Sequence, residues 1–294
     1  PPRSTLFPYT TLFRSICDAG KGYFFTISDF LKNILNFNAE KPYVSSFLCI
    51  FAKKITNLST KDMILQFKVK NFLSIREEQT LDFTASADKT YEDYAVVKIK
   101  GVRISKLGVV YGPNASGKSN ILKALAWFIF YLVASRSKKP GTGTGLTPFM
   151  MDEDSRNRNS SFELIFYIGD VRYEYSVVLN NQKIYKEELY FYPNNRRALF
   201  YERTWNEDKS NSSISFGPLL KLSATQKLFI ESNCISNATV LTTYKNANVE
   251  KNVELDKVFN YFESEFMPLL SKNDNLGQLA NDVEIGRASC RERV

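Results

Sequence analysis

The 294-residue chain contains no histidine. Ser-His-Asp sites, Cys-His sites and most zinc sites need an imidazole, so this chain cannot build them alone. Long apolar runs are also missing, because the longest, residues 124–134, spans about half of the roughly 20 residues that cross a bilayer. No charged-then-apolar leader opens the sequence. We therefore expect a cytoplasmic protein with no membrane partner, outside the histidine-dependent hydrolases.

Both ends of the chain read unlike ordinary protein sequence. Residues 5–15, TLFPYTTLFRS, look like the translation of a common sequencing-adapter oligonucleotide, and residues 285–294, IGRASCRERV, look like its other strand. Residues 16–62 show no sustained period, whereas Met63 opens a strand-like alternation. The sequence therefore predicts a non-native extension over 1–62 and an adapter-derived tail over 285–294. A genuine small N-terminal element is the alternative.

The net charge and the cysteine count are both less informative when these two ends are excluded. Of 39 Lys and Arg and 31 Asp and Glu, the ends hold 11 and 5, which leaves 28 against 26 in residues 63–284. The net charge of +8 therefore gives no support for nucleic-acid binding. Cys234 is the one cysteine in this range, so we expect a buried small side chain and neither an intrachain disulfide nor a cysteine metal cluster.

Hydrophobic periodicity divides residues 63–284 into strands and two helices. The 44% apolar and 14% aromatic content is enough for a folded core. A helix that is apolar nearly all round is predicted over 119–134, a polar loop over 135–160, and an amphipathic helix from Leu255 to near Pro268. Turns are expected at Gly169–Asp170 and Asn180–Asn181. Period-two alternation predicts strands over 63–70, 80–83, 95–103, 107–111, 162–168, 171–179, 184–192 and 198–204.

A phosphate-binding motif lies between the strand at 107–111 and the helix at 119–134. Residues 112–119, GPNASGKS, fit G-x-x-x-x-G-K-[ST], the Walker A P-loop, in its strand-to-helix context. Backbone N–H groups of such a loop and the helix N-terminus point at phosphate oxygens. Lys118 is expected to reach the β- and γ-phosphates and Ser119 to ligate Mg²⁺, which makes ATP and Mg²⁺ the predicted cofactors. The candidate binding residues are Gly112, Pro113, Asn114, Ala115, Ser116, Gly117, Lys118, Ser119 and Asn120.

The segment GPNASGKSNILKAL resembles the ATP-binding head of ABC-class ATPases such as SMC, RecF and OLD-family proteins, and KVKNFLSIREEQTLDF resembles their first strand and loop. Over residues 63–284 the chain also resembles bacterial proteins labelled AAA-family ATPase or ATP/GTP phosphatase. This resemblance implies an α/β P-loop NTPase, a partial ABC-class head with a central sheet, a flanking antiparallel β-meander and a helical C-terminal part. It also implies a homodimer in which two heads sandwich ATP.

Three later motifs of that family are absent from the sequence. These are a glycine-bearing signature, a run of four apolar residues ending in Asp-Glu (Walker B), and a switch histidine. We therefore expect a parent protein that hydrolyses ATP as a conformational switch, and a fragment that binds ATP but barely hydrolyses it.

Several segments imitate functional motifs. Residues 222–226, LSATQ, look faintly like a signature but lack its glycines, and residues 164–170 end an apolar run with the acid of a hairpin turn. Residues 140–145, PGTGTG, lack the strand-to-helix context of a phosphate loop and are expected to form a flexible linker. Glu187 and Glu188 are adjacent on a strand, so they face opposite sides and form no paired-carboxylate site.

Two other functions remain open. The chain is alternatively an ATP-gated effector of defence or repair that acts on nucleic acid or through a partner nuclease, or a non-functional translated fragment with exposed strand edges. A GTPase is disfavoured because no N-K-x-D motif is found. Five basic side chains could contact a nucleic-acid backbone, although we expect them to form a solvated face. They are Arg136, Lys138, Lys139, Arg196 and Arg197.

Overall fold

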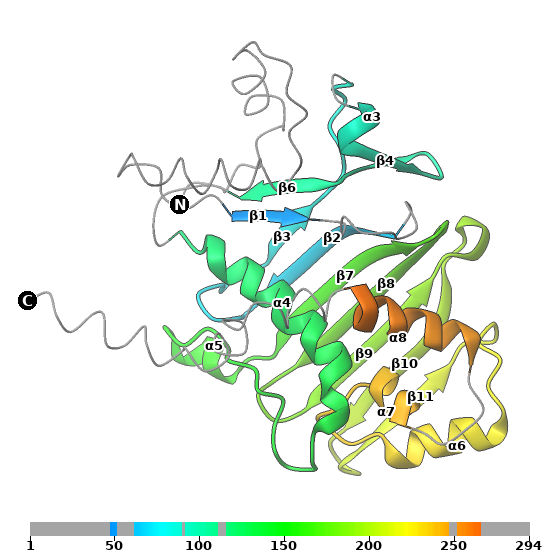
Figure 1. Cartoon of the computed structure of the whole chain (residues 1–294). Coiled ribbons are helices and arrows are strands. Elements are labelled where there is room, and N and C mark those ends of the chain that lie inside the picture. The colour runs from blue at the N-terminus through cyan, green and yellow to red at the C-terminus, as the bar shows by residue number, and fades with distance from the viewer. Residues whose placement is uncertain (1–47, 52–61, 90–91, 111–115, 247–251, 266–294) are drawn as a thin grey trace, which may run out of the picture.

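The computed structural model describes residues 48–51, 62–89, 92–110, 116–246 and 252–265, and the structural statements below concern these ranges. A seven-stranded antiparallel sheet dominates them, with strand order β11-β10-β9-β8-β7-β2-β3 (Figure 1). Its strands are β2 (Met63–Lys70), β3 (Gln79–Asp82), β7 (Ser160–Ile168), β8 (Val171–Leu179), β9 (Ile184–Phe191), β10 (Ala198–Asn206) and β11 (Asn211–Phe216).

Alternation of side chains fixes which face of this sheet is buried. In β8, Tyr173 and Tyr175 are fully buried, whereas Glu174 between them lies on the opposite face. The two-residue turn at Gly169–Asp170 joins β7 to β8, with Ile168 paired to Val171. Gly169 has a φ of 60°, a conformation that glycine adopts without steric cost, so the predicted hairpin turn is confirmed.

The expected central sheet flanked by a meander is corrected by the strand pairing. The opening hairpin β2–β3 belongs to the same sheet as the meander, because β2 pairs antiparallel with β7, with Phe67 opposite Leu164. Strand β7 thus lies between β8 and β2 in the interior of the sheet, and its C-terminal half is buried on both faces. The strand before the P-loop, β6 (Leu107–Val110), pairs instead with β1 (Leu48–Phe51) in a separate two-stranded sheet.

A third sheet replaces the strand predicted over 95–103. Lys100 and Gly101 both have positive φ, 46° and 84°, and turn the chain between β4 (Val96–Ile99) and β5 (Val102–Ser105). Before β4 lies the short helix α3 (Glu92–Ala95), and the Arg103 guanidinium of β5 donates to its Glu92 carboxylate at 2.8 Å. The hairpin therefore closes back on the chain that precedes it.

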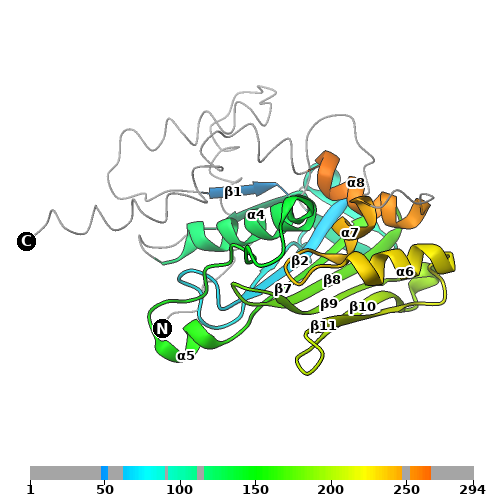
Figure 2. The same ribbon diagram turned by 90° about the horizontal axis from the view of Figure 1, so that it is seen from below.

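Four helices cover one face of the large sheet, as Figures 1 and 2 show from two directions. The predicted helices over 119–134 and from Leu255 are confirmed as the first and last of them, whereas the two between them and strand β11 were not predicted. The four helices are α4 (Lys118–Ala134), α6 (Ala224–Asn233), α7 (Val240–Asn246) and α8 (Val253–Glu265).

The region predicted as loop over 135–160 contains two short helices. The turn η1 (Ser135–Ser137) follows α4 directly, and α5 (Glu153–Asn157) begins where Asp152 Oδ1 accepts from the Ser155 N–H at 2.7 Å. This hydrogen bond is a helix N-cap, and it lowers the pKa of Asp152. The β9–β10 connection holds a further short turn, η2 (Pro193–Asn195).

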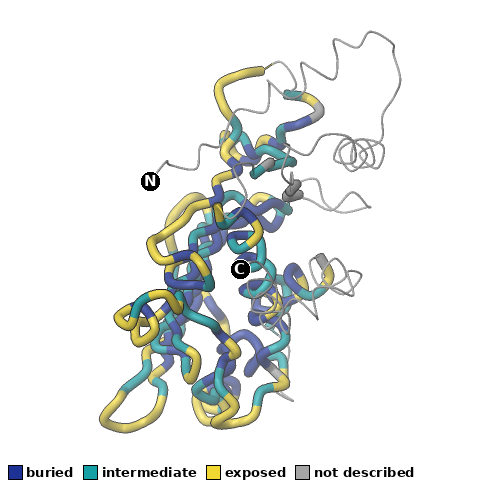
Figure 3. Tube along the Cα trace, turned by 90° about the vertical axis from the view of Figure 1, so that its left-hand side faces the viewer, coloured by how far each residue is buried: buried dark blue, intermediate teal, exposed yellow. Residues whose placement is uncertain are grey.

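Aromatic rings fill the space between α4 and the sheet. The ring of Phe162 stacks on that of Phe128 at 5.2 Å and lies 5.1 Å from that of Trp127, and both partners belong to α4. Figure 3 shows buried segments along the strands and the helices beside them, with exposed segments at the turns. In the described ranges no helix is long and apolar enough to cross a membrane.

We predict that Phe162→Ala lowers the free energy of unfolding by about 3–5 kcal/mol, because a buried ring that touches both α4 and the sheet is lost. Phe130→Ala is the control, since Phe130 lies on the same helix but is 49% exposed, and its effect is expected to be well under half as large. Urea denaturation of both variants measures the difference. Equal losses would contradict the view that α4 is held mainly through this ring.

Candidate functional site

The predicted phosphate-binding turn lies between β6 and α4, as its motif requires. Strand β6 ends at Val110 and α4 begins at Lys118. Ser116, Gly117, Lys118, Ser119 and Asn120 are described, whereas the candidate residues at positions 112–115, Gly112, Pro113, Asn114 and Ala115, lie outside the described residues. The adapter-like segments at 5–15 and 285–294 lie outside them too.

Gly117 determines how α4 starts. It is the N-cap of the helix with φ 89° and ψ 3°, in the left-handed region where other residues are strained. Gly117 has no side chain to cap the amides of the first turn, and α4 contains no acidic residue. The positive end of the helix dipole is therefore not neutralised by the helix's own side chains, which favours an anion.

The side chains of the first turn differ in exposure. Lys118 is 9% exposed, whereas the side chain of Ser119 is open to solvent. One cation and one hydroxyl thus stand beside the helix amides, a set that suits phosphate and its metal. The described residues hold no group of three or more Cys, Asp or Glu that would by itself bind a metal ion.

A second segment, the tight turn after β2, lies against this first turn. Phe72 and Ile75 exchange backbone hydrogen bonds of 2.8 Å, and Leu73 between them has a φ of 49°. This turn places Ser74 Oγ 2.6 Å from Asn120 Nδ2, which donates to it. Ser74 is a neighbour of the site that sequence reasoning missed. The signal was present in the segment KVKNFLSI, but nothing in that segment alone shows that it meets Asn120.

The segment that resembled a signature motif is a helix start. Ser223 Oγ accepts from the Gln226 N–H at 3.2 Å, while Gln226 Oε1 accepts from the Ser223 N–H at 2.6 Å. This reciprocal pair is the capping box of α6. Asp170 lies in the β7–β8 turn. Neither motif-like segment adds a residue to the site.

The glycine-rich segment at 140–145 departs from the flexible linker predicted for it. Thr144 is buried, and its N–H donates to the Asn181 carbonyl at 2.9 Å. The side-chain amide of Asn237 donates to the carbonyls of Lys139 and Gly143 at 2.9 and 3.1 Å. The backbone polar groups of residues 140–145 are thus paired within the protein. These hydrogen bonds fix the segment against the β8–β9 turn.

The adjacent glutamates, Cys234 and Arg197 make structural contacts. Glu187 is fully buried and Glu188 is partly exposed, so the two do face opposite sides of the sheet. Cys234 is partly buried and packs against the core, and burial raises the pKa of its thiol. Arg197 lies 3.5 Å from the centroid of the Tyr190 ring and donates to Glu174 at 2.9 Å, so a carboxylate already neutralises this cation.

Residues 107–266 match a family model described as "AAA domain, putative AbiEii toxin, Type IV TA system", and this range is more than half of the chain. The chain belongs to this AAA-domain family. The match begins at the first residue of β6 and spans the phosphate-binding turn, α4, the meander and the three later helices. No curated protein matches the chain. Membership in the AAA-domain family supports a nucleotide-binding ATPase of the P-loop kind.

We predict that Gly117→Ala costs about 1–2 kcal/mol of stability, because alanine is strained at this left-handed φ. Gly141→Ala is a matched control: its φ is 79°, against 89° for Gly117, and its added Cβ meets nothing within 4 Å. Both variants are expected to lose similar stability in thermal unfolding. The circular dichroism signal of helix should start to fall at lower temperature in each. An unfolding temperature of Gly117→Ala equal to that of the wild-type chain would contradict the observed start of α4.

Proposed function

We propose that this AAA-domain protein binds ATP with Mg²⁺ at residues 112–120. The observation that carries the proposal is the start of α4, where a left-handed Gly117 is followed directly by Lys118 and Ser119. A glycine N-cap leaves the first helix amides accessible to phosphate oxygens. The resemblance of GPNASGKSNILKAL to ABC-class heads supports the same residues.

Each residue of the turn has a distinct task in this proposal. The helix amides bind phosphate oxygens, and the Lys118 ammonium neutralises charge on the β- and γ-phosphates. The Ser119 hydroxyl would hold Mg²⁺, which would supply positive charge to offset that of the phosphates. Asn120 is held by Ser74 on the turn after β2, so the first turn of α4 is fixed from the side.

ATP is proposed to act mainly as a conformational ligand. Fast hydrolysis needs a carboxylate that supports Mg²⁺ and a base that orients water, and Lys118 and Ser119 supply neither. The sequence contains no run of four apolar residues followed by Asp-Glu. We therefore expect this chain to bind ATP and to turn it over slowly.

We predict that Lys118→Ala weakens ATP–Mg²⁺ binding by about 30- to 150-fold, since a charge-assisted contact worth about 2–3 kcal/mol is lost. Lys123→Ala is the control, because Lys123 lies on the same helix beyond its first turn. Titration with a fluorescent ATP analogue measures both. Equal affinities in the two variants would contradict the proposed site.

The same proteins separate binding from hydrolysis. Phosphate release from the unaltered chain should remain close to that of Lys118→Ala. Steady release that Lys118→Ala abolishes would overturn the slow-turnover part of the proposal and leave ATP binding in place.

A further inference from the structure

A fully buried ion pair lies far from the phosphate-binding turn, on two adjacent strands. Glu187 of β9 and Arg203 of β10 are register partners, both are 0% exposed, and Arg203 Nη1 lies 3.7 Å from Glu187 Oε2. Burying two charges carries a large desolvation cost, and apolar residues of similar volume often give equal or greater stability. Stability alone therefore does not explain why this ion pair is buried here.

The carboxylate of Glu187 holds the start of α7. Both of its oxygens accept from the Val240 N–H at 3.0 Å, and Oε1 also accepts from the hydroxyls of Tyr175 and Tyr201 at 2.6 and 2.9 Å. Burial raises the pKa of Glu187, while Arg203 and these donors oppose the rise. The carboxylate thus ties the sheet to the first residue of α7.

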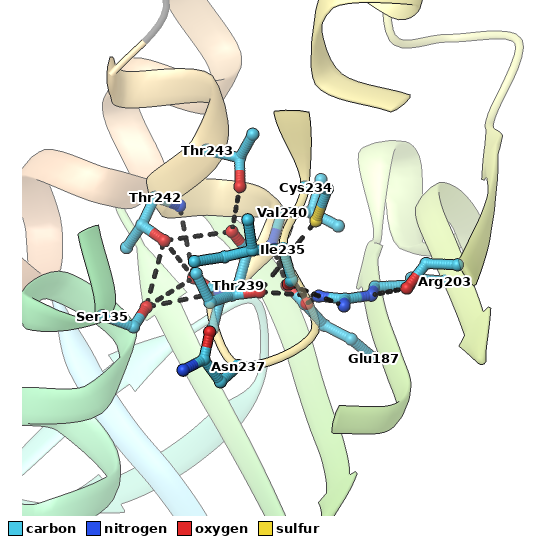
Figure 4. A network of polar contacts seen from close by, with 12 residues as sticks. Ser135, Glu187, Arg203, Cys234, Ile235, Asn237, Thr239, Val240, Thr242 and Thr243 are labelled. Carbon is cyan, nitrogen blue, oxygen red and sulfur yellow. Dashed lines mark hydrogen bonds and ion pairs between the residues drawn. The ribbon is translucent and has the colours of Figure 1, made fainter. Parts of the chain in front are cut away.

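The guanidinium of Arg203 holds the chain just before α7. Nη1 donates to the Ala238 carbonyl at 2.6 Å and Nη2 to the Ile235 carbonyl at 2.9 Å, while Nε donates to Ser212 Oγ at 2.9 Å. Figure 4 shows the two charged side chains meeting the segment 235–240 from one side. The planar fork of arginine fixes two carbonyls at once, which sets the position of this segment.

The same segment meets the C-terminal end of α4 from its other side. Ser135 is the C-cap of α4, and its Oγ lies 3.0 Å from Thr242 Oγ1 and accepts from the Thr239 N–H at 3.3 Å. One turn earlier, the Tyr131 hydroxyl donates to the Asn237 carbonyl at 2.8 Å. A continuous set of hydrogen bonds thus runs from the Glu187–Arg203 pair to the end of α4 (Figure 4).

This linkage matters because α4 begins at the phosphate-binding turn. A helix of its 17 residues is about 25 Å long, so contacts at its last turn bear on the position of its first turn. Apolar contacts such as Phe128 on Phe162 resist separation but tolerate small slides, whereas directional hydrogen bonds fix a helix along its axis and in rotation.

We propose that Glu187 and Arg203 are positioning residues for nucleotide binding, which hold α4 in register on the sheet through the segment 235–242. The inference rests on the proposed function, since it concerns the placement of the first-turn amides of α4. Neither residue touches nucleotide; both act through Ser135 and Tyr131.

The test is ATP–Mg²⁺ affinity in the full chain, with Glu187→Gln as the first variant and Ser135→Ala as the second. Glu187→Gln keeps the volume and removes the charge. Ser135→Ala removes one of the two links to α4 and leaves the Tyr131 link and the buried pair in place. Both should weaken binding by about 3- to 30-fold, the range of mutations along a coupled network. The double variant should lose little more than Glu187→Gln alone, because the two act through one path.

Two control variants separate positioning from general destabilisation. Ser212→Ala removes an Arg203 hydrogen bond that lies outside segment 235–240, and it should leave affinity within about twofold. Phe200→Leu disturbs a fully buried ring that contacts Tyr173 and Phe191, and it should lower stability without lowering affinity. A loss of affinity in Phe200→Leu as large as in Glu187→Gln would overturn the inference.

Trp127 gives a readout that does not depend on nucleotide. It lies on α4 and stacks on Tyr131 at 5.0 Å, and replacing the chain's other tryptophan by Trp205→Phe leaves it as the only indole. Its emission maximum should shift in Glu187→Gln and Ser135→Ala but not in Phe200→Leu. If the wild-type chain binds ATP and Glu187→Gln changes neither the affinity nor the Trp127 emission maximum, this inference is wrong and the proposed function stands. No binding of ATP by the wild-type chain would overturn the proposed function, and the nucleotide role of the pair with it.

Discussion

The packing of α4 on the large sheet is the interaction on which the rest of the structure depends. This helix is apolar nearly all round, and nine of its seventeen residues are buried. Its rings meet those of β2 and β7 around Phe162, while α7 and α8 contact it from the side. A helix held this way cannot tilt without opening the core. The hydrophobic core therefore holds α4 against the sheet, and hydrogen bonds at its two ends fix its position along its axis.

The two ends of α4 carry different polar contacts, and each follows from its place. At the first turn Gly117 leaves the amides uncapped, and Ser74 holds Asn120 from the neighbouring turn. At the last turn Ser135 bonds to Thr242 within a network that reaches the buried Glu187–Arg203 pair. We propose that one end receives an anion, whereas the other is anchored to the sheet. The AAA-domain match covers α4 and the network at its last turn, from β6 to the end of α8, whereas Ser74 lies before the matched range.

Local patterns predicted the parts of this fold that depend on neighbours in sequence. The sequence predicted helix α4 and the meander strands from their hydrophobic periods, and the hairpin turn from Gly169–Asp170. It also predicted that the P-loop lies between a strand and a helix. The pairing of β2 with β7 joins residues about a hundred positions apart, and periodicity does not say which edge a strand will meet. Helix α7 contains the β-branched Thr242 and Thr243, whose helix propensity is low, so tertiary contacts decide its conformation. The Ser223–Gln226 capping box was visible in the sequence but was compared with a signature motif instead.

The central claim is that the first-turn amides of α4 bind the phosphates of ATP. Hydrogen–deuterium exchange of the chain with and without ATP–Mg²⁺ tests it most directly, because it reports on the amides themselves. Peptides that cover residues 116–122 should exchange more slowly when ATP–Mg²⁺ is present, by more than peptides from β9 to β11. Binding of ATP–Mg²⁺ with unchanged exchange at the start of α4, or with slowing confined to another part of the chain, would contradict the account.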